Sequence, residues 1–250
     1  MKTRLNKYLA DRGIGSRRHV DGLIEISQVI VNKKIAVLGM QVDESDEIFV
    51  EGQLVQKAKP KSIYIAFNKP VGLITSVDPK MHDNVIEYIN YPERIFPIGR
   101  LDVASSGLLL LTNDGILSEH ITHPRFDHEK EYLVTVSRTI DDHALNQMAK
   151  GMVILDEMTK PAKVTRVDDD TFKIILTEGK NRQIRRMCES LGYDVRKLRR
   201  IRVMNIDLDD LGIGKWRLLT DKEVDTLKKL LKLDQLPIIP EVSEKKISFT

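Results

Sequence analysis

The sequence contains 250 residues, 41% of them hydrophobic and 31% charged, which suffices for one large and one small domain with a buried core. Its single cysteine, Cys188, excludes an intramolecular disulfide and argues against a thiolate zinc site. The net charge of +3 favours anionic partners only mildly, but basic residues crowd residues 180–202. The sequence lacks a signal-peptide run at its start and any apolar stretch of ~18 residues, so we expect a soluble, cytoplasmic protein without membrane contact.

The first 58 residues predict two short helices and a small sheet. Leu5, Tyr8 and Leu9 have helical spacing within a helix over residues 4–15, which glycines end. Ser16 is a good N-cap for the second helix. Short strands are then predicted at Val29–Val31, Ile35–Val37 and Glu47–Val50. The segment Gln56–Ser62 is polar, basic and interrupted by proline, which is typical of a linker.

We therefore place the first domain at 1–58, the linker at 59–62, a second domain at 63–235 and a polar C-terminal tail at 236–250. In the second domain, turns are predicted at Asn68–Gly72 and Ser105–Gly107. Helices are predicted at His82–Ile89, Ile116–Thr122, Asp141–Lys150, Gln183–Leu191 and, behind a Thr220–Glu223 capping box, Asp221–Leu233. Strands are predicted at Tyr64–Phe67, Gly72–Ser76, Leu108–Leu111, Tyr132–Val136, Met152–Leu155, Ala162–Val167, Thr171–Leu176, Lys197–Val203 and Ile206–Leu208. This irregular order favours an α+β fold with a mixed or antiparallel sheet.

The segment Phe96–Gly115 contains the main candidate for chemistry. Asp102 follows an apolar residue and an arginine and precedes the apolar run Leu108–Leu111, although aspartate is a poor strand former. The aspartate either caps a loop or is placed for catalysis. Two later polar segments, His128–Tyr132 and Glu178–Met187, favour the catalytic interpretation.

Three motifs occur in order: GRLD at Gly99–Asp102, KEY at Lys130–Tyr132 and GKNRQIRRM at Gly179–Met187. Together they resemble the RsuA/RluB/RluE/RluF family of pseudouridine synthases, over about residues 1–235. The segments HEKEYLVTV, NRQIRRMCE and Gly192–Met204 look most like the RluF branch, which acts on large-subunit ribosomal RNA. The N-terminal region resembles the S4 RNA-binding domain, except that Asn32-Lys33 replaces its common Asn-Gly turn.

The resemblance implies a catalytic domain with a cleft across a central mixed sheet, and a reaction that needs no cofactor. It implies that Asp102 is the catalytic carboxylate, that Arg185 keeps it ionised, and that Tyr132 packs on the flipped base. Taken alone, Arg185 also fits a solvated helix arginine, and Tyr132 a core tyrosine. Further RNA contacts are expected from Arg100, Leu101, Val103, Arg182, Gln183 and Ile184, and in the first domain from Arg4, Lys7, Arg17, Arg18, Lys33 and Lys34.

The expected partner is ribosomal RNA, most of all 23S, for a monomeric enzyme. Small-subunit ribosomal RNA and transfer RNA stay open as substrates, and so does a non-catalytic RNA-binding protein. A carboxylate-based hydrolase would need a second carboxylate, for which Asp114 and Glu131 are candidates. No metal site is expected, because His120 and His123 lack a third ligand at a convincing spacing.

Overall fold

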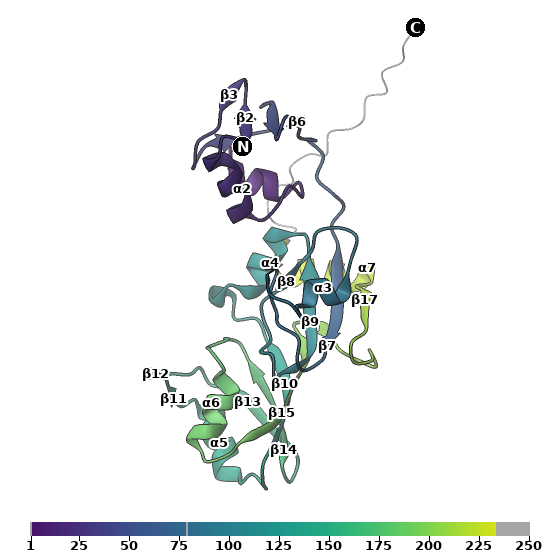
Figure 1. Ribbon diagram of the computed structural model, residues 1–250. Coiled ribbons are helices and arrows are strands. Elements are labelled where there is room, and N and C mark those ends of the chain that lie inside the picture. Colours follow the sequence, from purple (N-terminus) through teal and green to yellow (C-terminus); the bar gives the residue numbers. More distant parts are fainter. Residues whose placement is uncertain (1, 79, 234–250) are drawn as a thin grey trace.

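The computed structural model describes residues 2–78 and 80–233, so the predicted tail at 236–250 lies outside the described residues (Figure 1). The N-terminal unit is a pair of helices on small sheets with a core of its own, formed by residues between Leu5 and Val55. Its four-stranded sheet has the order β3-β2-β5-β6, and β1 pairs with β4. The elements are β1 Thr3–Arg4, α1 Leu5–Ala10, α2 Arg17–Glu25, β2 Val29–Val31, β3 Lys34–Ile35, β4 Gln41–Val42, β5 Ile48–Val50 and β6 Gln53–Leu54.

Two details of this unit differ from the prediction. The first helix ends at Ala10, because the Ile14 amide returns to the Leu9 carbonyl (3.2 Å) around Gly13, whose φ is +84°. The strands β1, β4 and β6 were not predicted, since two-residue strands carry no periodic signal. The Ser16 cap is confirmed, because its side chain accepts a hydrogen bond from the His19 amide (3.1 Å).

A nine-stranded sheet forms the centre of the second unit, with the path β13-β14-β10-β15-β9-β7-β17. All described pairs are antiparallel except β15 with β9, so the predicted α+β fold with a mixed sheet is confirmed. The strands of this sheet are β7 Tyr64–Lys69, β8 Phe96–Ile98, β9 Ser106–Thr112, β10 Lys130–Val136, β13 Lys163–Asp168, β14 Thr171–Leu176, β15 Val195–Val203, β16 Ile206–Asp207 and β17 Trp216–Leu218. A separate two-stranded sheet consists of β11 Val153–Ile154 and β12 Glu157–Met158.

Helices cover both halves of this sheet (Figure 1). They are α3 Val85–Ile89, α4 Gly115–Thr122, the 3-10 turn η1 Pro124–Phe126, α5 Asp142–Lys150, α6 Gln183–Ser190 and α7 Asp221–Leu230. Leu108 and Leu110 belong to one core cluster and Leu109 and Leu111 to another, so β9 is buried on both faces, as its continuous apolar run predicts. The capping box of Thr220 and Glu223 is confirmed. No helix within residues 2–78 and 80–233 is long and apolar enough to cross a membrane.

Two predictions around the catalytic segment were wrong. Residues 72–76 form no strand, because Ile74 bonds to Asp83 and Val85 instead of to the main sheet. Gly107 is not in a turn but in β9, at φ +102°. A Cβ there would lie 2.2 Å from the Arg200 carbonyl oxygen, so glycine is required for the close approach of β9 and β15.

Candidate active site

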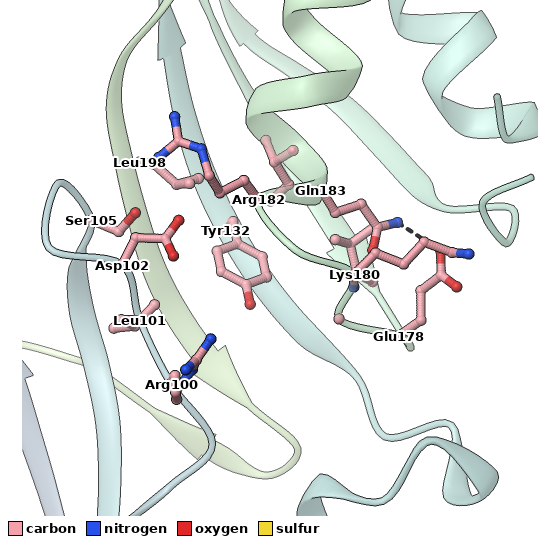
Figure 2. Close-up of a pocket in the computed structure, with 13 residues that line it drawn as sticks. Arg100, Leu101, Asp102, Ser105, Tyr132, Glu178, Lys180, Arg182, Gln183 and Leu198 are labelled. Atoms are coloured by element: carbon pink, nitrogen blue, oxygen red, sulfur yellow. Dashed lines mark hydrogen bonds between the residues drawn. The ribbon is translucent and has the colours of Figure 1, made fainter. Parts of the chain in front are cut away.

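A cleft opens where the loop that follows β8 faces β10 and the start of α6 (Figure 2). It has two lobes that share seven lining residues, among them Asp102, Tyr132 and Arg182. We call the smaller cavity, about 120 Å³, the Asp102 lobe, and the larger one, about 260 Å³, the Arg200 lobe. The three motifs of the sequence therefore meet in one place.

The Asp102 loop is held from several sides. Leu101 is buried, and its carbonyl accepts a hydrogen bond from the Thr75 hydroxyl (2.8 Å). The Ser105 amide donates to the Asp102 carbonyl (3.0 Å), which closes a turn. The Asp102 side chain thus projects into the cleft from a fixed backbone (Figure 2).

Lys69 is a buried cation beneath this loop, and it was not among the predicted site residues. Its ammonium group donates to the carbonyls of Ser105 and Pro70, each at 2.9 Å. Burial lowers the pKa of Lys69 to about 8, although the Asp102 charge opposes that shift. The turn predicted at Asn68–Gly72 was wrong for its first two residues, because Asn68 and Lys69 are the end of β7. The sequence carries no signal that places Lys69 under a loop 36 residues away.

Arg185 lies on α6 and reaches the same loop. It is only 8% exposed, which excludes the solvated helix arginine. Its guanidinium donates to the carbonyls of Ala104 (2.8 Å) and Val195 (3.2 Å) and forms no ion pair with Asp102. Burial and the Arg182 charge lower the pKa of Arg185, and the Asp102 charge raises it. Arg185 therefore bonds to the backbone beside Asp102 and not to its carboxylate.

Tyr132 lies across the cleft from Asp102 on β10, an interior strand of the sheet (Figure 2). Its ring packs against the core clusters of both halves of the sheet and also lines both lobes. The core interpretation and the site interpretation therefore both apply to Tyr132.

The remaining residues of the third motif differ in exposure. Arg182 is exposed and occupies the N-cap of α6 at φ +51°, and its side chain extends towards the Asp102 side of the cleft (Figure 2). Gln183 is buried and holds the loop between β14 and α6, since its side chain donates to Glu178 (2.7 Å) and accepts from the Lys180 amide (3.1 Å). Ile184 and Leu101 line the Asp102 lobe as apolar walls. Arg100 lines both lobes, whereas Val103 is exposed and lines neither.

The two carboxylates considered for a hydrolase lie outside the cleft. Asp114 caps α4 and accepts a hydrogen bond from the Tyr64 hydroxyl (2.9 Å). Glu131 pairs with Arg202 (2.9 Å) on the face of β10 opposite to Tyr132. Glu178 does line the cleft, but Gln183 and the Lys160 amide (3.0 Å) already bond one of its oxygens. Within the described ranges, no group of three potential metal ligands occurs.

The six candidate cations of the N-terminal unit lie at three places: the start of α1, the start of α2 and the β2–β3 turn. All are exposed except Lys7, which is half-buried, and none forms an ion pair within the described residues. Their charges are therefore available to an anionic partner.

Comparison with known proteins agrees with this geometry. Residues 63–190 match the family model for RNA pseudouridylate synthase, and residues 3–48 match that of the S4 domain. The chain is 44% identical to the dual-specificity RNA pseudouridine synthase RluF of Escherichia coli K12, with 97% of this chain and 84% of that protein covered. It is 38% identical to the ribosomal large subunit pseudouridine synthase B of Bacillus subtilis 168, with 91% and 96% covered.

A crystal structure of a pseudouridylate synthase superposes with a TM-score of 0.67 at 33% identity, covering 90% of this chain and 99% of that one. Both the synthase domain and the S4 domain are thus matched in sequence and, over most of the chain, in fold. The chain belongs to the RsuA/RluB/RluE/RluF family and is an RNA pseudouridine synthase, an isomerase with an N-terminal S4 domain.

Proposed function

We propose that the protein converts a uridine of 23S ribosomal RNA to pseudouridine in the Asp102 lobe. The observation that carries the proposal is the position of Asp102, fixed by Lys69 and Arg185 through its loop and facing Tyr132 across the cleft. The relative named for the ribosomal large subunit supports 23S RNA as the substrate. The dual-specificity name of the E. coli relative favours a second RNA substrate, and transfer RNA stays open as that substrate. Such an enzyme acts in the cytoplasm, and we propose that it acts as a monomer.

The reaction breaks the N1–C1′ bond of uridine, turns the base and joins C5 to C1′. C5 then loses its proton and N1 gains one, so the product is an isomer of the substrate. Asp102 is the carboxylate next to the sugar, as nucleophile or as base towards a ribose proton. Lys69 and Arg185 place positive charge near it without neutralising it in a direct pair. Tyr132 supplies a flat surface for the turned base and a phenolic oxygen towards C5.

A stacked uridine must leave the RNA helix before it reaches Asp102, at a cost of a few kcal/mol. Arg100 is exposed at the mouth of both lobes, where it can fill the gap or hold the flipped backbone. The exposed cations of the S4 domain bind phosphates farther along the RNA and so position it.

Replacing Asp102 with asparagine tests the proposal, because the amide keeps the shape and removes the charge. Pseudouridines are mapped in ribosomal RNA from cells that carry either form, and turnover is measured on the mapped RNA. We expect Asp102→Asn to abolish turnover while RNA binding survives, and the exposed control Asp209→Asn to behave as wild type. Activity within tenfold of wild type, about 1.4 kcal/mol on the barrier, would refute the assignment.

A further inference from the structure

The Arg200 lobe is the larger part of the cleft, and the roles given above use only those of its residues that also line the Asp102 lobe. Its lining contains five basic side chains and two carboxylates, and both carboxylates are shared with the Asp102 lobe. The part that belongs to this lobe alone holds Lys130, Arg200, His123 and His128 and no acidic residue. This end of the cleft is therefore positively charged.

Arg200 is the most informative residue of this lobe. It is 3% exposed and projects from β15 on the same face as Tyr132, its partner on β10. Its Nε donates to the Leu108 carbonyl (2.7 Å) and its Nη1 to the Arg100 carbonyl (3.5 Å). Its buried Nη2 has no hydrogen-bond partner, and no ion pair of the described residues includes Arg200. A buried guanidinium without a counter-ion is costly, unless an anion joins it when the site is occupied.

Lys130 lies beside Arg200 on the same wall. It shares the cleft face of β10 with Tyr132, two residues along the strand. Its ammonium group has one described bond, to the His128 carbonyl (3.2 Å), which leaves two of its donors for another group. Burial, and then the Arg200 charge, lower the pKa of Lys130, so the two cations are close enough to repel each other.

We propose that the Arg200 lobe is a phosphate subsite, in which Arg200 Nη2 and Lys130 Nζ hold the RNA phosphodiester next to the target uridine. The proposal rests on the proposed function, because Asp102 and Tyr132 wall both lobes and so place the bound uridine and this phosphate side by side. A phosphodiester fits better than a base, since the free donors carry charge and lack acceptors. A phosphodiester also carries only one negative charge, which limits its repulsion by the Asp102 carboxylate at the shared wall.

The decisive variant is Lys130→Met, because Arg200→Met would also remove the donor to Leu108 between β15 and β9. The matched control is Lys173→Met, which alters an exposed lysine of β14 on the opposite face of the sheet. The probe is a synthetic stem-loop with the mapped uridine, made with one neutral methylphosphonate linkage at each position around that uridine. Dissociation constants and turnover are measured for every pair of full-length protein and RNA.

In the wild type and in Lys173→Met, we expect one neutral linkage next to the uridine to weaken binding about tenfold, as removal of a charge-assisted hydrogen bond does. Lys130→Met should bind the unmodified RNA about tenfold more weakly, with a salt slope lower by about 0.7, and it should be less sensitive to that linkage than the wild type, because only Arg200 still contacts the phosphate. Equal sensitivity of Lys130→Met and wild type, or binding unaffected by every linkage, would overturn the subsite. Failure of the wild type to convert the unmodified stem-loop would instead contradict the proposed function, and the binding measurements would still test the subsite.

Discussion

Replacing Lys69 with methionine tests whether a buried charge holds the Asp102 loop. The folded protein lowers the pKa of Lys69 from 10.5 to about 8, mainly through burial. At one pKa unit for ~1.4 kcal/mol, the charged form costs the folded state about 3 kcal/mol relative to the unfolded chain. The hydrogen bonds to the carbonyls of Ser105 and Pro70 offset part of the free-energy cost of burying the charge, and they are the reason why the charge is tolerated.

The sign of the pH dependence follows from proton binding. Below pH 8, Lys69 is protonated in both states, and its contribution to stability does not change. Between about pH 8 and 10.5, the unfolded chain keeps the proton and the folded protein loses it, so the free energy of unfolding rises with pH. We therefore expect the stability of the wild type, relative to Lys69→Met, to rise by about 1.4 kcal/mol per pH unit in that window.

Urea unfolding of both proteins at pH 7, 8, 9 and 10 measures this difference. The single tryptophan, Trp216, reports on the second domain, because β17 pairs with β7, the strand that contains Lys69. Turnover of the wild type should fall above pH 8, where the cation next to Asp102 is lost. A stability difference that stays constant from pH 7 to 10 would refute the conclusion that burial lowers the pKa of Lys69.

Three further predictions concern the site and the domains. Gly107→Ala should destabilise the second domain by several kcal/mol in urea unfolding, since its Cβ would meet the Arg200 backbone at 2.2 Å and the residue has φ +102°. Arg185→Met should reduce turnover at least a hundredfold, because the carbonyl of Ala104 loses its donor and the loop loses a nearby cation. Deletion of residues 1–58 should leave a folded domain that binds ribosomal RNA with a shallower salt slope, by about 0.7 for each phosphate that the S4 domain neutralises in the full-length protein. Circular dichroism checks the folding of the truncated protein, and salt titration of RNA binding measures its salt slope. A saturating concentration of a stem-loop substrate should restore much of its turnover rate.

Each of these expectations has a contrary outcome. A Gly107→Ala protein as stable as wild type would mean that β9 and β15 separate easily. Turnover of Arg185→Met at the wild-type level would show that the arginine does not support the Asp102 loop. An unchanged salt slope after the deletion would mean that residues 1–58 do not contact the nucleic acid.

The sequence alone determined those features that depend on short-range order. Helical spacing and caps located α2 and α7, because a cap and a periodic apolar face lie within one short segment. The continuous run Leu108–Leu111 predicted a strand buried on both faces. The three motifs predicted Asp102, Tyr132 and the α6 arginines as one site, because their residue types and order are a signature that needs no coordinates.

Tertiary structure alone decided how that site is built. Arg185 bonds to the Ala104 backbone, 81 residues away, and Arg200 to the Leu108 backbone, 92 residues away. Neither contact can be predicted from the sequence pattern, because each depends on how β15 and α6 pack against β9. Gly107 resembled a turn residue for the same reason: the backbone that excludes a Cβ belongs to Arg200. Buried cations without acidic partners become recognisable only when burial and hydrogen bonds are known, since a lysine or arginine in the sequence is by default an exposed one.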